Sequence, residues 1–328
     1  MAHDLEIING EAQMFSVRET PWHGLGKIVS SAPTAAEAIR LAGLDWKVIE
    51  NQIYHCQPQL QGEMTQITSH KAIVRETDDK VLGIVGKDYT PLQNDKAFDF
   101  FNPFIESGLA SFETAGSLRD GKTIWVLAKL NKTPIEIGKG DIVNKYLLLS
   151  NGHDGLMAVR TGFTPIRVVC NNTLAMSHEN ANSKLLRIFH SRNVNVRLEA
   201  VQQIINAADA KFEATADQYR ALSRSDVDQK KLAKYVEIVF GFSGVDEQRR
   251  QIAKEKITEN ITRLFETGVG QDLKGAKGTY WGLYNAVTEM LSWEKGRTED
   301  SRLNSLWFGQ AKQVNQNALS VALKMAVG

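Results

Sequence analysis

The spacing of apolar residues changes once along this 328-residue chain, near residue 195. Before that point, short runs rich in β-branched and aromatic residues alternate with turn residues. After it, apolar residues recur three and four positions apart, which is typical of amphipathic helices. We therefore predict an α+β fold, with a β-rich N-terminal domain (1–194) containing a mixed or antiparallel sheet and helices. An all-helical C-terminal region (195–328) follows, for packing and oligomerisation.

In the N-terminal part, Asp78-Asp79 and Asp120-Gly121 predict turns between strands. The predicted strands are Gln66–Arg75, Val81–Val85, Thr123–Leu130, Lys145–Ser150 and Ile166–Cys170. Helices are predicted over Thr34–Ala42, Asn94–Ser107 and, briefly, Asn171–Ser177. Thr34 and Glu37 have the spacing of a capping box, which fixes where the first of these helices begins.

Glycine-rich breaks at Gly241–Gly244 and Gly268–Gly278 divide the C-terminal part into helices. The predicted helices are Val196–Leu222, Asp226–Phe240, Asp246–Thr267, Thr279–Trp293 and Leu303–Ala326. Aromatic residues at helical spacing predict core packing rather than a ligand site; they are Tyr280, Trp281, Tyr284, Trp293, Trp307 and Phe308.

Charge and composition exclude several classes of protein. There are 39 Lys and Arg against 38 Asp and Glu, so the net charge of +1 gives no global case for nucleic acid or a membrane. No run approaches the ~18 consecutive apolar residues of a membrane span, and the N-terminus lacks a signal-peptide pattern. We expect a cytoplasmic protein in which Cys56 and Cys170 are reduced, partly buried thiols.

The segment Gly116–Thr123 fits the Walker A pattern GxxxxGK[ST]. A phosphate-binding loop needs a helix after it, because the amides and the dipole at the helix N-terminus hold the phosphate. Here the strand-like run IWVLAKL follows, so we interpret Asp120-Gly121 as a hairpin turn. A nucleotide-dependent enzyme using this loop remains an alternative.

Histidines raise the question of metal binding or general-base chemistry. No HxxxH, HExxH or Cys/His ligand spacing occurs, so we predict neither a metal nor a cofactor. His153 beside Asp154 has the composition of a general base with its orienting carboxylate, and hydrolysis by this pair is a second enzymatic alternative. The simpler interpretation of the dipeptide is a solvated turn.

Basic residues are spread through the β-rich part, in places next to an aromatic residue. The candidate nucleic-acid-binding residues are Arg119, Lys122, Arg160, Arg167, Arg187, Phe189, His190 and Arg192. Guanidinium groups that hold phosphates, together with rings that stack on bases, suit single-stranded nucleic acid. Only part of the set can share one surface, because strand residues alternate between faces; the competing interpretation is a solvated charged face.

Several segments together resemble a known family. They are PWHGLG (21–26), YTPLQNDKAFDFF (89–101), ETAGSLRDGKTIWVLAKL (113–130), YLLLSNGHDG (146–155), TPIRVVCNNTL (164–174) and GTYWGLYNAVTEMLSW (278–293). In this order they resemble the phage/plasmid-like family built on domain of unknown function 932. The resemblance implies a role in the DNA metabolism of mobile elements and supplies no catalytic residue. In outline the chain is also similar to phage single-strand annealing proteins, an analogy of architecture only.

From these residues and this resemblance we expect a non-enzymatic, oligomeric protein that binds single-stranded DNA and anneals or recombines it. Arg160, Arg167, Arg187 and Arg192 would contact phosphates, with His190 beside them. Arg119 and Lys122 would clamp the strand from a hairpin tip, and Phe189 would stack on a base. Besides the two enzymatic alternatives, a mobile-element protein that blocks a host factor remains open; it would present an exposed apolar patch on the C-terminal helices.

Overall fold

The computed structural model describes residues 5–18, 25–57, 63–157, 159–167, 172–173, 194–242, 246–294, 305–306 and 309–327. The chain forms two compact units, each composed of separate stretches of sequence. The first contains residues 1–131, 147–162 and 182–201, and the second contains residues 132–146, 163–181 and 202–328. The change of pattern near residue 195 falls within the helix α5 (Val194–Leu222).

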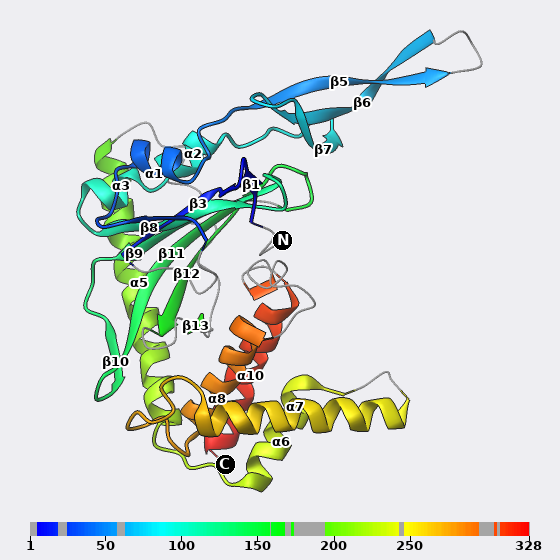
Figure 1. The fold of residues 1–328 in the computed structure, drawn as a ribbon. Helices are drawn as coiled ribbons and strands as arrows, with labels where there is room; N and C mark the ends of the chain where they lie inside the picture. Colours follow the sequence, from blue (N-terminus) through cyan, green and yellow to red (C-terminus); the bar gives the residue numbers. More distant parts are fainter. Residues whose placement is uncertain are drawn as a thin grey trace. The chain divides into compact units, whose positions relative to one another are not determined.

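The main sheet of the first unit is mixed, as predicted, with the strand order β11-β9-β8-β3-β4 (Figure 1). Its strands are β11 (Asp141–Gly152, of which Leu147–Gly152 belong to this unit), β9 (Thr123–Leu130), β8 (Ala110–Leu118), β3 (Met14–Val17) and β4 (Lys27–Val29). β8 pairs antiparallel with both β9 and β3, whereas β3 and β4 run parallel. Seven of the eight residues of β9 are buried, which explains the apolar run Ile124–Ala128 within it.

A second, antiparallel sheet in this unit consists of β5 (Val48–Gln57), β6 (Glu63–Arg75) and β7 (Lys80–Gly86). β6 and β7 contain the predicted strands Gln66–Arg75 and Val81–Val85, and the predicted turn at Asp78-Asp79 joins them. A short hairpin of β1 (Ile7–Ile8) and β2 (Glu11–Ala12) precedes the main sheet.

The helices of the first unit confirm one boundary and correct another. α1 (Ala35–Leu41) begins after the predicted capping box, in which Thr34 and Glu37 bond reciprocally. The single helix predicted over Asn94–Ser107 is wrong, because it is divided into α2 (Asn94–Asp99) and α3 (Asn102–Glu106). Pro103 explains the division, since proline lacks an N–H and is tolerated only in the first turn of a helix.

Three other sequence predictions need correction. β12 spans Arg160–Arg167, earlier than the strand predicted at Ile166–Cys170, whose residues 168–170 lie outside the described residues. Asn172–Thr173 form the strand β13 rather than part of the predicted helix Asn171–Ser177, whose other residues lie outside the described part of the chain. Cys56 is exposed rather than partly buried, because it lies on the outer part of β5; Cys170 is outside the description.

In the second unit, β10 (Ile135–Gly138) pairs with the beginning of β11, and β13 pairs with the end of β12. The helices are α5 from residue 202 onward, α6 (Gln229–Phe240), α7 (Glu247–Thr267), α8 (Tyr280–Glu289) and α10 (Gln310–Val327). A π-helical turn, η2 (Met290–Glu294), extends α8. Of the helix predicted over Leu303–Ala326, residues 305–306 are helical and α10 begins at Gln310 after a bend at Gly309; residues 303–304 and 307–308 lie outside the described residues.

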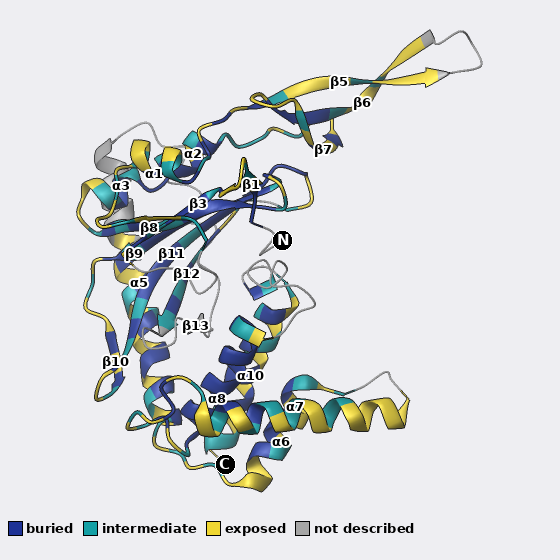
Figure 2. Ribbon diagram, in the orientation of Figure 1, coloured by how far each residue is buried: buried dark blue, intermediate teal, exposed yellow. Residues whose placement is uncertain are grey.

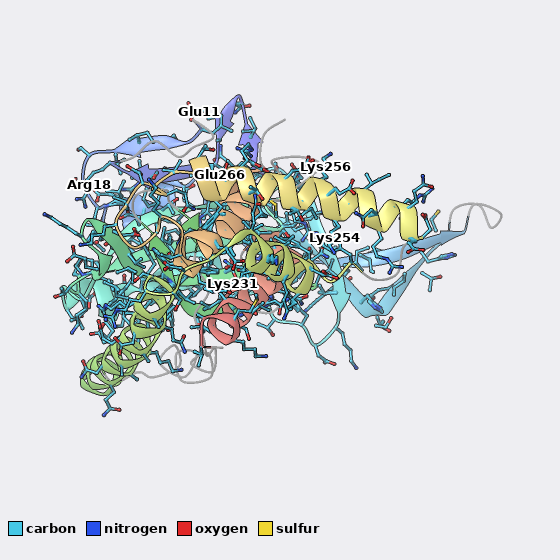
Figure 3. All side chains as sticks on the ribbon, turned by 90° about the horizontal axis from the view of Figure 1, so that it is seen from below. Glu11, Arg18, Lys231, Lys254, Lys256 and Glu266 are labelled. Atoms are coloured by element: carbon cyan, nitrogen blue, oxygen red, sulfur yellow. The ribbon has the colours of Figure 1, made fainter. Side chains whose placement is uncertain are left out.

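The predicted aromatic core of the second unit is confirmed for Tyr280, Trp281 and Tyr284, all of which are buried. Tyr219 of α5 lies with its ring centroid 4.8 Å from that of Trp281, whose indole Nε1 donates a 2.8 Å hydrogen bond to Asp141. Trp307 and Phe308, which the sequence also places in the core, lie outside the described residues. By contrast, α7 buries only Ile261 and Leu264 among its residues, as its charge-rich sequence predicts. Figure 3 labels Lys254 and Lys256 on this helix and Lys231 on α6.

Candidate nucleic-acid interface

Three connections of the first unit meet at one end of its main sheet, which we call the loop end. They are the β8–β9 turn (119–122), the segment after β11 (153–157) and the β6–β7 turn (76–79). The His153 amide donates to the Lys122 carbonyl at 2.8 Å, and Arg119 forms a 3.0 Å ion pair with Asp154. Lys80, which follows the third connection, lies 3.6 Å from the Asp120 carboxylate. β12 begins at Arg160, after the second connection.

The β8–β9 turn confirms the hairpin interpretation of the Walker A-like segment. Arg119, Asp120 and Gly121 have φ values of 55°, 59° and 85°, so three consecutive residues adopt the left-handed region that tight hairpin turns require. Thr123 then begins β9, and no helix follows in this fully described stretch. The strand–loop–helix geometry that holds phosphate at a helix N-terminus is therefore missing from residues 116–130.

A buried ion-pair cluster supports the turn. The guanidinium of Arg75 is 2.7 Å from Glu6, and both side chains are 2% exposed. Arg75 also bonds Asp78 at 2.8 and 2.9 Å, and Glu6 accepts a 2.7 Å hydrogen bond from Ser117. A Cβ atom at Gly121 would lie only 3.0 Å from Arg75, so the cluster lies directly against the turn.

The charge state of this cluster is fixed. Burial alone would lower the pKa of Arg75, but its contacts with Asp78 and Glu6 outweigh burial and raise that pKa. Arg75 therefore stays cationic, and it lies 5.2 Å from the centroid of the Trp46 ring as a cation–π pair. Arg75 is thus a structural residue and is not available at the surface.

His153 is fully buried, with its ring edge-on to Trp46 at 5.4 Å. Its Nε2 lies 2.9 Å from Asn94 Oδ1, while Asn94 Nδ2 donates to the Leu44 carbonyl at 3.0 Å. Because the Asn94 oxygen must then accept, Nε2 of His153 carries the proton. Among the described residues, Nδ1 has no hydrogen-bond partner.

Burial lowers the pKa of His153 from 6.5 to about 4; Asp154 acts in the opposite direction, and Arg75 adds to the lowering. The ring is therefore neutral at pH 7. A general base has to reach the proton that it abstracts, and a ring with no exposed surface does not. The solvated turn considered from the sequence is also wrong for this dipeptide, since both residues are buried. His153 instead fixes the position of the connection after β11.

The candidate residues divide into three groups. Arg119 and Lys122 lie together in the β8–β9 turn, but the Arg119 guanidinium already forms an ion pair with Asp154, whose side chain is 5% exposed. Arg160 is exposed, Lys122 is half-buried, and neither has an ion-pair partner in the described part of the chain. Arg167 is the last residue of β12 and belongs to the second unit, and its side chain is not described. Arg187, Phe189, His190 and Arg192 lie outside the described residues.

An exposed apolar side chain completes the surface. Leu156, in the connection between β11 and β12, is 81% exposed. Its amide donates to the Asp154 carboxylate at 3.0 Å, which holds the backbone beside it. Tyr89 also lies against this connection, where its hydroxyl donates to the Gly152 carbonyl at 2.9 Å. The loop end therefore combines two available cations with an apolar side chain on a fixed backbone.

Sequence reasoning missed the residues that build this support: Glu6, Trp46, Asn94 and the buried role of Arg75. One signal was present for Arg75, which ends the apolar run Ala-Ile-Val and precedes Asp78 by three residues. Within the described residues, no group of three or more His, Cys, Asp or Glu is placed to hold a metal ion. The described helices are each too short or too polar to cross a membrane.

Comparison with known proteins gives one match. A family model with the description "Domain of unknown function (DUF932)" matches residues 81–307, which is more than half of the chain. The match includes the β8–β9 turn, the connection after β11 and most of the helices of the second unit. No curated protein and no solved structure matches the sequence.

Proposed function

Because the chain belongs to the DUF932 family, whose description assigns no activity, we propose a function from its own residues: it binds single-stranded nucleic acid through the loop end. Lys122 and Arg160 contact phosphates, and Leu156 contacts an unstacked base. Arg119 positions the connection through Asp154. In this proposal the protein works in the cytoplasm as a homo-oligomer and brings complementary DNA strands together.

The observation that carries the proposal is the exposed Leu156 in the connection that leads to Arg160 and lies against the carbonyl of Lys122. Cations alone would favour any polyanion, duplex or single strand. An apolar side chain finds few apolar groups on an undistorted duplex beyond the thymine methyls, whereas a single strand exposes the faces of its bases. The combination therefore favours single-stranded nucleic acid over duplex.

The rigidity of the loop end supports the same proposal. Arg119 and Asp120 have positive φ although neither is glycine, so their backbone is strained. Such strain is retained where the surrounding structure enforces it, often at functional sites. Here the Arg119–Asp154 ion pair and the bond between His153 and Lys122 enforce it. Because the turn is already fixed, the protein itself loses little conformational entropy when a polynucleotide binds.

The test measures binding of a fluorescently labelled single strand, and of the corresponding duplex, by anisotropy at low salt. We expect the double variant Lys122→Ala/Arg160→Ala to lose about tenfold or more in affinity for both forms, since each charged hydrogen bond contributes about 1.5–3 kcal/mol. We expect Leu156→Ser to weaken single-strand binding and leave duplex binding unchanged.

Lys230→Ala is the matched control, because Lys230 is an exposed lysine on α6 with no ion-pair partner among the described residues. Absence of single-strand binding by the wild type at low salt would refute the proposal. Equal losses in the double variant and in the control would refute the assignment of the site.

A further inference from the structure

The three-stranded sheet of the first unit has an open edge. β5 forms one side of the order β5-β6-β7, and among the described strands it pairs with β6 alone. β7 pairs with β6 from His70 to Arg75, so within the described part of the chain the outer part of β6 also has no second neighbouring strand. Figure 1 shows β5 and β6 extending well beyond β7 as a two-stranded ribbon.

The hydrogen bonds of Val48 show which groups of β5 face away from β6. The amide of Val48 donates to the Gln93 side-chain oxygen at 3.0 Å, and its carbonyl accepts from Gln93 Nε2 at 2.8 Å. Because antiparallel residues alternate between bonding inward and outward, and the register of β5 against β6 is regular from Val48 to Gln52, the main-chain groups of Glu50 and Gln52 also point outward. Among the described residues, none of these outward groups has a partner.

This edge lacks the features that usually prevent strand pairing. Val48–Gln57 contains no proline, lysine or arginine. Its one acidic residue, Glu50, is neutralised by Lys71 at 2.7 Å. Gln93 protects only the first residue of the strand.

The outer ribbon also exposes apolar surface. Ile53–Cys56 pair with Met64–Ile67, and both faces of this ribbon are largely accessible (Figure 2). Tyr54 pairs with Gln66 and Met64 with Cys56, two positions along the ribbon and therefore on the same face; Tyr54 and Met64 are 51% and 71% exposed. An isolated two-stranded ribbon is marginally stable in water, so this ribbon gains stability by pairing with another strand.

We propose that β5 pairs with β5 of a second copy of this chain, antiparallel and across a two-fold axis. An antiparallel edge is complementary to itself, because each outward amide and carbonyl meets its counterpart in the other copy. The neutralised Glu50 removes charge repulsion between the copies. Nucleic acid and acidic peptides would find no cation on β5, which leaves an uncharged strand as the fitting partner.

The test compares Gln52→Pro with Gln52→Ala in the full chain, using analytical ultracentrifugation over a range of concentrations. Both variants lose the side-chain bond between Gln52 and Tyr54, but only proline removes the outward amide. We expect the wild type and Gln52→Ala to reach twice the 36.5 kDa mass of one chain. Gln52→Pro should raise the dimer dissociation constant at least tenfold, with an unchanged circular dichroism spectrum.

Hydrogen exchange provides a second measurement that does not depend on a variant. The outward amides of Glu50 and Gln52 should exchange more slowly as the wild-type concentration rises. A wild type that stays monomeric, or a Gln52→Pro variant that dimerises as well as Gln52→Ala, would overturn the proposal. Binding of a single strand at the loop end is a separate readout, so either proposal fails independently of the other.

Discussion

At the scale of single residues, the loop end depends on buried polar groups whose charges are fixed by their neighbours. Arg75 and Glu6 are each 2% exposed and neutralise one another, while His153 is kept neutral by burial. These side chains are almost wholly buried, so in the proposed site their role would be to hold Lys122, Leu156 and Arg160 in position.

His153 should make stability depend on pH below neutrality. The unfolded chain binds a proton near pH 6.5, whereas the folded chain binds it only near pH 4, so acid favours unfolding between these values. From pH 7 to pH 5 the free energy of unfolding should fall by about 2 kcal/mol because of His153. In urea unfolding, the His153→Gln variant should lack this fall in the free energy of unfolding. An equal pH dependence of stability in the wild type and the variant would contradict the prediction.

Removing one partner of the buried ion pair should cost more than removing both. Arg75→Met leaves the Glu6 carboxylate buried without a cation, which should lower the free energy of unfolding by about 3–5 kcal/mol. The double variant Glu6→Leu/Arg75→Met should recover part of that loss in urea unfolding. Asp78→Asn is the control: its side chain is 45% exposed, solvent screens its charge, and the expected change is below about 1 kcal/mol. A double variant less stable than Arg75→Met would disprove the assigned pairing.

At the scale of elements, the loop end depends on the close approach of β7 to the connection after β11. A Cβ atom at Gly83 would lie 2.5 Å from the Cα atom of Asp154, and that contact is with backbone, which has to move. At Gly86 on the same strand, a Cβ atom would meet nothing within 4 Å. Neither glycine has a positive φ, so the comparison isolates packing from backbone strain.

Gly83→Ala should therefore destabilise the protein by about 1–3 kcal/mol, as overpacking does, and weaken single-strand binding by displacing Asp154 and Arg119. Gly86→Ala should change stability by less than about 0.5 kcal/mol. Thermal unfolding and anisotropy measure the two effects. Equal behaviour of the two variants would show that the connection is not packed against β7.

The elements that the sequence predicts well are those whose signals are local. The capping box of Thr34 and Glu37, the buried run Thr123–Leu130 and the Asp120-Gly121 turn are all confirmed. β5 and β8 were not predicted, because their exposed or mixed polar residues give no clear alternation. The association of Glu6 with Arg75 and of Asn94 with His153 depends on contacts between residues 69 and 59 positions apart, which no local pattern encodes.

At the scale of the whole molecule, the near-neutral charge of +1 means that any nucleic-acid binding depends on a few local cations. Salt is the direct probe of such contacts, because each neutralised phosphate releases counterions. On a single strand, each contact contributes about −0.7 to the slope of log affinity against log salt concentration. The number of cations in use can therefore be counted in solution.

The most direct test of the account is this slope, measured with a labelled single strand for the wild type and for Lys122→Ala/Arg160→Ala. We predict that the double variant binds with a slope less steep by about 1.4, corresponding to two lost phosphate contacts, while Lys230→Ala retains the wild-type slope. An unchanged slope in the double variant, or a wild type that does not bind at low salt, would contradict the claim that the loop end holds nucleic acid.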